Sequence, residues 1–140
     1  MRHEAAGVTE ILLDSAKNEF LEYGFHDASV RRVGAKSGVS TISLYTRFHD
    51  KTGLFGAVVK EAADGLMEIY LNSISEAKET FDVKQAMQIG GEGTDIVLKY
   101  IYKYKDEFKL IFCCSVGTEY ENYFDKLAAI EENYYRQFAK

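Results

Sequence analysis

Apolar residues recur at intervals of three and four along most of this 140-residue chain, which is the spacing of one face of an α-helix. In the first such stretch the apolar face consists of Val8, Ile11, Leu12, Ala16 and Phe20. Gly24 follows soon after, and glycine commonly closes a helix because it tolerates a left-handed backbone. We therefore predict a first helix over residues 8–23 that buries this face.

Two short helices separated by a tight turn are predicted next. Ser29 is a good N-cap for a helix over residues 30–37, because its hydroxyl can accept a hydrogen bond from a backbone N–H of the first turn. Gly38 suits the turn, and Ser40 can cap a third helix over residues 41–48. The pattern therefore predicts two helices joined by a turn at Gly38.

The remainder of the chain is also predicted to be helical. Asp50 can cap the first of four further helices, which are expected over residues 51–73, 82–105, 106–114 and 118–138. The run of glycines at 90, 91 and 93 predicts a break or kink in the second of these, because each glycine costs about 1 kcal/mol relative to alanine. The sequence shows no strand alternation and contains no proline, so we predict an all-α fold.

The segment from Ser29 to Phe48 has the pattern of a helix-turn-helix. Leu44 and Phe48 are expected to be buried and to anchor its second helix, which leaves the other faces of that helix outside. The outward-facing residues are expected to be Thr41, Ile42, Ser43, Tyr45, Thr46 and Arg47. Their hydroxyl, methyl, aromatic and guanidinium groups suit base edges, thymine methyls and phosphates. A purely structural helix pair is the alternative, but this face lacks the Glu/Lys pairs of an inert surface.

Charge is distributed unevenly along the chain. Residues 26–60 hold six basic and two acidic side chains, a net charge of +4, whereas residues 61–140 hold nine basic and fifteen acidic ones, a net charge of −6. A basic segment beside an acidic remainder is typical of a DNA-binding domain joined to another domain. The distribution therefore agrees with the helix-turn-helix pattern, although the total charge is −5.

From Val8 to Val59 the sequence resembles the N-terminal domain of the TetR/AcrR family of repressors. The family's Phe-x-x-x-Gly-Phe pattern is matched by residues 20–25, and its later pattern is matched by Ser29, Gly38-Val39-Ser40, Leu44-Tyr45, Phe48 and Lys51. Two positions depart from the pattern: Ile42 replaces a small residue or proline, and Gly34 replaces an alanine. The resemblance implies a three-helix DNA-binding domain over residues 1–50 and a helical ligand-binding and dimerisation domain over residues 51–140.

The resemblance also assigns roles to individual side chains. Phosphate contacts are implied for Ser40, Tyr45, Lys51 and Arg47, and base contacts for Thr41, Ile42 and Ser43. Arg31 would reach a base or a nearby phosphate, whereas one of the adjacent Arg31 and Arg32 is expected to face solvent only. Lys51 could instead simply be solvated near a helix start.

As a member of this family the protein would be a transcriptional repressor. It would bind double-stranded operator DNA and be released by a small-molecule effector held in the C-terminal domain. Family members continue for several dozen residues beyond the equivalent of Lys140, and their last two helices form the dimer interface. The C-terminal domain is therefore expected to be incomplete, through truncation or as a shortened member, and a homodimer is expected if the natural chain is longer.

Aromatic residues of the C-terminal part are candidates for lining the effector site. The candidates are Tyr100, Tyr104, Phe112, Tyr120 and Phe124, since ligand pockets combine apolar walls with a few polar groups. Core packing is the alternative for each of them. Cys113 and Cys114 lie in an apolar run and are expected to be buried, inert thiols, with a redox or electrophile sensor as the alternative.

Other classes of function find little support in the sequence. The three histidines lack the spacing of a metal site, so we expect no metal and no other cofactor. No pairing of a nucleophile with a base indicates an enzyme, although Cys113 or Cys114 could serve a thiol-dependent one. No apolar run spans a membrane and no secretory signal is present, so we expect a cytoplasmic protein. The main alternative to a repressor is a shortened helical module that binds a protein partner and not DNA.

Overall fold

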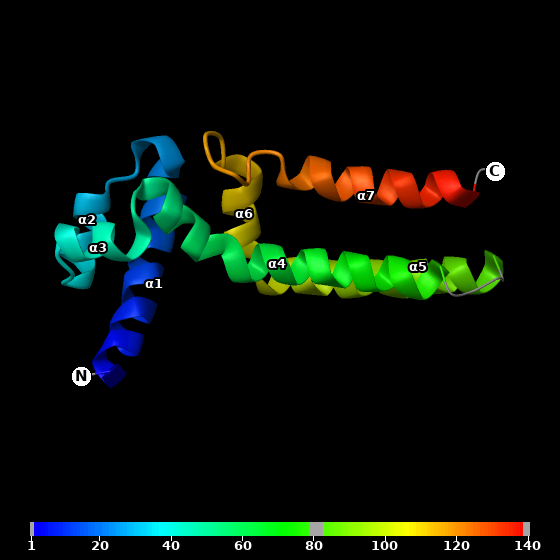
Figure 1. The fold of residues 1–140 in the computed structure, drawn as a ribbon, viewed down its shortest axis with the longest axis horizontal. Helices are drawn as coiled ribbons and strands as arrows, with labels where there is room; N and C mark the ends of the chain where they lie inside the picture. Colours follow the sequence, from blue (N-terminus) through cyan, green and yellow to red (C-terminus); the bar gives the residue numbers. More distant parts are fainter. Residues whose placement is uncertain (1, 79–82, 139–140) are drawn as a thin grey trace. The chain divides into compact units, whose positions relative to one another are not determined.

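The computed structural model describes residues 2–78 and 83–138, and within these ranges it contains seven helices and no strand (Figure 1). The helices are α1 (Arg2–Asp27), α2 (Val30–Ser37), α3 (Thr41–Phe48), α4 (Lys51–Lys78), α5 (Val83–Lys103), α6 (Lys105–Cys113) and α7 (Tyr123–Phe138). The predicted all-α fold is thus confirmed. None of the described helices is both long enough and apolar enough to cross a membrane.

The chain divides into two compact units. The first consists of residues 1–61 and 106–121, and the second of residues 62–105 and 122–140. Helix α4 begins in the first unit and continues into the second, and the chain returns to the first unit for α6 and the loop that follows it. The functional boundary at residue 50 stays a prediction, since these units describe packing alone.

The core of the first unit is built on the apolar face of α1. Leu12, Ala16 and Phe20 are all at most 1% exposed, whereas Ile11, which was expected beside them, is 58% exposed, so that prediction is wrong. The Phe20 ring packs edge-on against Phe55 of α4, with 5.1 Å between the ring centroids. Burying side chains of this size stabilises a fold by about 1.5–3 kcal/mol each.

The predicted boundaries of the two short helices are confirmed by their caps. The Ser29 hydroxyl accepts a hydrogen bond from the backbone N–H of Arg32 at 3.2 Å. The Ser40 hydroxyl accepts one from the N–H of Ser43 at 3.1 Å. Each cap satisfies a backbone donor that the helix itself leaves unpaired.

The first helix is interrupted close to its predicted end. Gly24 has φ 75° and ψ 173° inside α1, whose helical backbone resumes for a short stretch as far as Asp27. This region of backbone space is essentially restricted to glycine. The predicted stop at Gly24 is therefore a sharp bend followed by one more turn.

Two predictions about the later helices are wrong. Helix α5 is continuous through the glycines at 90, 91 and 93, so the expected break is not present. Gly93 is buried, and tertiary packing of this kind outweighs the weak helix preference of glycine. Helix α7 begins at Tyr123 rather than near Thr118, because the Thr118 hydroxyl donates a hydrogen bond to the carbonyl of Ser115 at 2.7 Å and holds a turn there.

Two tyrosine hydroxyls join the helices of the second unit. Tyr100 of α5 donates to the carbonyl of Ala62 at 3.1 Å, and Tyr123 of α7 donates to the carbonyl of Ala63. Helix α5 lies along the second half of α4 (Figure 1). A side chain at Gly65 would overlap the Tyr100 hydroxyl, so glycine at this position of α4 permits the close approach of α5.

Candidate DNA-binding site

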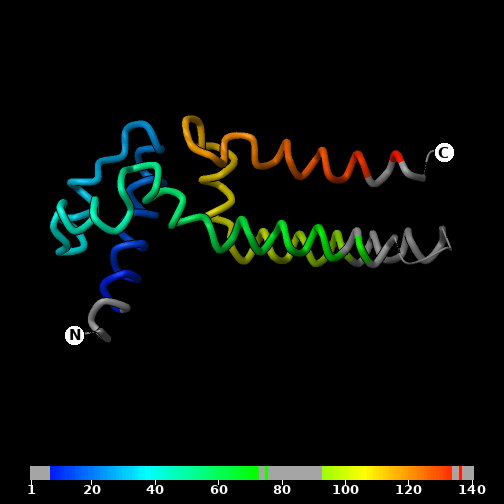
Figure 2. Tube along the Cα trace, in the orientation of Figure 1, coloured from blue at the N-terminus to red at the C-terminus, as the bar shows by residue number. Residues whose placement is uncertain are grey.

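The turn between α2 and α3 is tight and depends on glycine at two positions. Gly38 has φ 76° and ψ 16°, a left-handed conformation, and the N–H of Val39 bonds the carbonyl of Gly34 at 3.1 Å. A Cβ atom at Gly34 would lie 2.6 Å from the Val39 carbonyl oxygen and 3.2 Å from Leu44 Cδ1. Gly34, which departs from the family pattern, thus lets α2 approach the turn closely. Figure 2 shows this turn in the cyan part of the trace.

Helix α3 is anchored through one side and exposes the other. Leu44 is 2% exposed, as predicted, whereas Phe48 is only half-buried. The exposed side chains of this helix are Thr41, Ile42, Tyr45, Thr46 and Arg47, and Ser43 is half-buried. The expected orientation of the helix is therefore present, although the DNA contacts of these side chains stay predictions.

Arg47 connects α3 to the first turns of α1. Its Nη1 donates a hydrogen bond to the Thr9 hydroxyl at 2.8 Å. A guanidinium has five N–H donors, so this bond leaves donors that a phosphate could accept. The contact with Thr9 has no local signal in the sequence, because the two residues are 38 positions apart.

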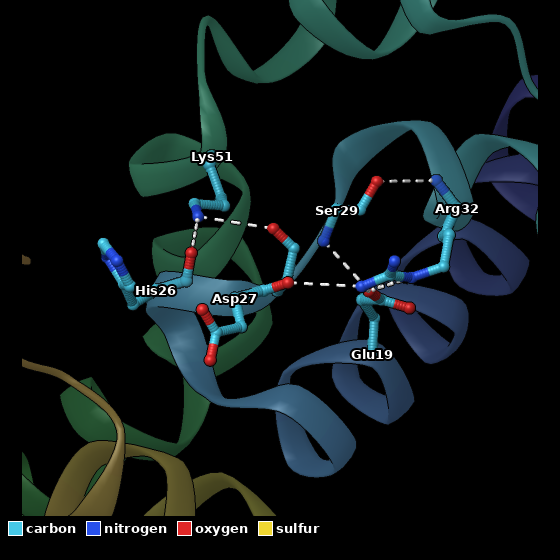
Figure 3. Close-up of polar contacts among 7 residues, drawn as sticks. Glu19, His26, Asp27, Ser29, Arg32 and Lys51 are labelled. Carbon is cyan, nitrogen blue, oxygen red and sulfur yellow. Dashed lines mark hydrogen bonds and ion pairs between the residues drawn. The ribbon is translucent and has the colours of Figure 1, made fainter.

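Lys51 has structural partners that the sequence did not suggest. Its Nζ donates to the carbonyl of His26 at 2.7 Å and to that of Ala28 at 3.3 Å (Figure 3). The same ammonium lies 4.9 Å from the centroid of the Phe25 ring. Lys51 therefore ties the start of α4 to the link between α1 and α2, and its predicted phosphate contact would use the remaining N–H.

Beneath α2 lies a buried carboxylate that the sequence analysis missed. Glu19 of α1 is 0% exposed, and its Oε2 accepts hydrogen bonds from the N–H of Ser29 at 2.9 Å and from Arg32 Nε at 2.8 Å (Figure 3). The sequence does indicate that Glu19 is buried, because it follows Ala16 by three residues and this spacing puts it on the apolar face of the helix. The carboxylate thus connects α1 to the first turn of α2.

Electrostatics favour the charged forms of both members of this pair. Burial raises the pKa of the Glu19 carboxyl, but the hydrogen bonds from Arg32 and Ser29 outweigh burial and leave the pKa below its ordinary value of 4.5. The hydrogen bond to Glu19 in turn raises the pKa of Arg32. Arg32 also lies over the ring of Tyr23, 4.2 Å from its centroid. Both arginines are exposed, but the guanidinium of Arg32 is engaged with Glu19 and the Tyr23 ring, and the DNA contact of Arg31 stays a prediction.

Three of the candidate effector-binding aromatics belong to the second unit. The rings of Tyr100 and Tyr104 have their centroids 4.9 Å apart, and Phe124 packs edge-on against Tyr123. The hydroxyl of Tyr100 is committed to the carbonyl of Ala62. These contacts give each residue a packing role, and their part in an effector site stays a prediction.

The other two candidates belong to the first unit. Tyr120 packs near Phe55, with ring centroids 6.4 Å apart, while Phe112 of α6 is 75% exposed. Beside Phe112, Cys113 is exposed and Cys114 is half-buried, so the prediction of two buried thiols is wrong for Cys113. Burial and the neighbouring Cys113 raise the pKa of the Cys114 thiol, which lowers its thiolate fraction and reactivity at neutral pH.

Comparison with known proteins finds similarity over the N-terminal part of the chain, which includes α2 and α3. The family model for bacterial regulatory proteins of the tetR family matches residues 12–58. The chain is 34% identical over 58 residues to the HTH-type transcriptional repressor Rv1474c of Mycobacterium tuberculosis, covering 41% of this chain and 31% of that protein. It is 32% identical over 63 residues to the HTH-type transcriptional regulator BetI of Escherichia coli, covering 45% of this chain and 32% of that protein.

A solved structure extends the likeness of fold to most of the chain. The TetR-like transcriptional regulator from Rhodococcus sp. RHA1 superposes with a TM-score of 0.53 at 20% identity, covering 90% of this chain and 64% of that chain. The curated matches span only about a third of the length of each relative. Residues 12–58 of this chain thus match the family model for bacterial regulatory proteins of the tetR family, and the likeness to the solved structure concerns the fold alone.

Proposed function

We propose that this protein is a transcriptional regulator that binds double-stranded operator DNA through α2 and α3. The observation that carries the proposal is the orientation of α3, which buries Leu44 while Thr41, Ile42 and Tyr45 are exposed. In a helix-turn-helix the second helix enters the major groove with such a face, and the first helix braces it.

In this proposal the side chains around α3 divide between phosphates and bases. Phosphate contacts come from Ser40, Tyr45, Arg47 and Lys51. Base contacts come from Thr41, Ile42, Ser43 and Thr46, and Arg31 reaches a base or a phosphate. Phosphate contacts supply most of the salt-sensitive affinity, and base contacts select the sequence.

The proposed mode of action is repression relieved by a small molecule. One matched relative, Rv1474c, is named a repressor. The chain would act as a homodimer whose two recognition helices lie about one DNA turn apart, roughly 34 Å. An effector bound among the aromatic residues of the helical C-terminal part would favour a conformation in which this spacing is lost. Such a role places the protein in the cytoplasm, where bacterial DNA lies.

Binding of the whole chain to promoter fragments, measured at several salt concentrations, tests the proposal. We expect the logarithm of the association constant to fall linearly with the logarithm of the salt concentration, because phosphate contacts release counterions. Tyr45→Phe should weaken binding roughly tenfold, since it removes one hydrogen bond to a charged phosphate.

A matched control is Tyr102→Phe, which removes the hydroxyl of another exposed tyrosine, on α5. This variant should bind DNA as the unmodified protein does. Affinity that does not change with salt would contradict the phosphate contacts, and equal affinity of the two tyrosine variants would remove Tyr45 from the site. No measurable binding to any fragment would contradict the DNA-binding proposal and favour the helical module that binds a protein partner.

A further inference from the structure

The outermost positions of α3 are occupied by Ile42 and Thr46. They lie two residues before and two residues after the buried Leu44, and at 3.6 residues per turn each is about 200° around the helix from it. Ile42 is 80% exposed and Thr46 is exposed. These two side chains are therefore the ones that a partner in front of the helix would meet first.

The hydroxyl proton of Thr46 is committed to the helix itself. Its Oγ1 donates a hydrogen bond to the carbonyl of Ile42 at 2.9 Å. While this bond is kept, Thr46 can offer a partner its methyl group and the lone pairs of its oxygen, but no donor. The front of α3 thus presents the branched alkyl group of Ile42 and, one turn further on, a methyl group.

A single exposed apolar residue is common on protein surfaces and carries no conclusion alone. Here the two alkyl groups occupy the centre of the face that the proposed function places in the major groove. The C5-methyl of thymine is the apolar group that base pairs display in that groove. Alkyl groups at these two positions therefore match thymine, whereas guanine would call for a donor such as arginine or lysine.

We infer that Ile42 and Thr46 select operator sequence by packing against thymine C5-methyl groups. The inference rests on the proposed DNA-binding function and specifies what the site reads. Burying one methyl group is worth about a fourfold change in affinity. A half-site read by Ile42 and Thr46 should accordingly contain thymines whose replacement weakens binding even when every hydrogen bond is kept.

Replacement of thymine by uracil tests this directly, because uracil differs only in lacking the C5-methyl. The probe is a duplex enriched by the whole chain from a pool of random DNA duplexes, then resynthesised with one thymine changed to uracil at a time. We expect about fourfold weaker binding at each contacted thymine. An enriched duplex that tolerates uracil at every position would overturn the inference while leaving DNA binding intact. A selection that enriches no duplex would instead contradict the proposed function itself.

Paired variants separate the methyl from the hydroxyl of Thr46. Thr46→Val keeps a methyl without the hydroxyl and should still distinguish thymine from uracil, whereas Thr46→Ser keeps the hydroxyl and should lose that distinction. Ile42→Ala should lose it at the neighbouring base pair, and Ile96→Ala, at an isoleucine of α5 that is 53% exposed, should change nothing. The opposite order, with discrimination kept by Thr46→Ser and lost by Thr46→Val, would assign recognition to the hydroxyl and refute methyl reading.

Discussion

At the scale of single residues, Glu19 is a buried charge that the fold keeps ionised. Only its Oε2 has hydrogen-bond partners among the described residues, while Oε1 is buried without one. A buried carboxylate is tolerated when it is paired and hydrogen-bonded. Because Ser29 and Arg32 both belong to the start of α2, the charge fixes the position of the helix that braces α3.

The pKa of Glu19 leads to a prediction about stability and pH. Its folded-state pKa lies below 4.5, so its charge stabilises the fold fully at pH values above the unfolded-state pKa. This contribution is lost as the pH falls through the folded-state pKa. We expect Glu19→Gln to be less stable than the unmodified protein at neutral pH, with the difference shrinking in acid. Urea unfolding between pH 7 and about pH 3 measures it. The matched control is Glu10→Gln, at an exposed position of α1, which should be as stable as the unmodified protein at neutral pH.

Gly34 leads to a second prediction at this scale. Alanine has the better helix propensity by about 1 kcal/mol, yet its Cβ would lie 2.6 Å from a backbone oxygen of Val39. Since that backbone cannot yield easily, Gly34→Ala should lower the free energy of unfolding by about 1–3 kcal/mol. Gly7→Ala, where a Cβ meets no atom within 4 Å, is the matched control. An unchanged or raised stability of Gly34→Ala would show that the turn can open.

At the scale of elements, the role of Ser40 as the cap of α3 can be separated from its proposed contact with DNA. Ser40→Ala should cost about 1 kcal/mol of stability, because it removes the acceptor for the N–H of Ser43. Ser40→Asp restores the acceptor but adds a negative charge where a phosphate is proposed to bind. We expect Ser40→Asp to unfold like the unmodified protein and to bind DNA several-fold more weakly. Equal affinity of Ser40→Asp and the unmodified protein would place Ser40 away from the DNA backbone.

The elements also show which features of the fold are determined by residues close together in the sequence. Helices α2 and α3 were predicted to the residue because their limits depend on Ser29, Gly38 and Ser40, whose capping and turn preferences act within a few positions. The start of α7 could not be predicted, since it depends on hydroxyl and backbone bonds within residues 115–121. Nothing in the residue types at 118–121, Thr-Glu-Tyr-Glu, prevents a helix from starting there.

The same distinction applies to the candidate site. The exposed face of α3 follows from the periodicity around Leu44, so its residues were found from sequence. The partners of Arg47, Lys51 and Glu19 were not, because each lies 10 to 38 positions away along the chain. Long-range polar contacts produce no periodic pattern in the sequence. Only the place of Glu19 on the apolar face of its helix indicated that its side chain would need a polar partner.

At the scale of the whole molecule, the packing units do not follow the order of the chain. The helix-turn-helix belongs to a unit that also contains residues 106–121. Tyr120 packs near Phe55, and Gly117 lies close to the Phe25 ring. Two aromatic side chains of the first unit therefore pack against a segment that follows α5 in sequence.

This arrangement predicts that the N-terminal segment is weakened when it is cut from the rest. A fragment of residues 1–61 keeps α1, α2 and α3 but loses the segment that covers Phe25 and Phe55. We expect its free energy of unfolding to be lower than that of the whole chain by at least about 1.5 kcal/mol, the lower figure for exposing one buried aromatic side chain. Tyr120→Ala in the whole chain should shift stability in the same direction by a smaller amount. Circular dichroism during urea unfolding compares the three proteins. The fragment could instead unfold as cooperatively as the whole chain and at the same urea concentration. The first three helices would then form an independent domain, as the boundary at residue 50 predicts, and α6 would contribute nothing to their stability.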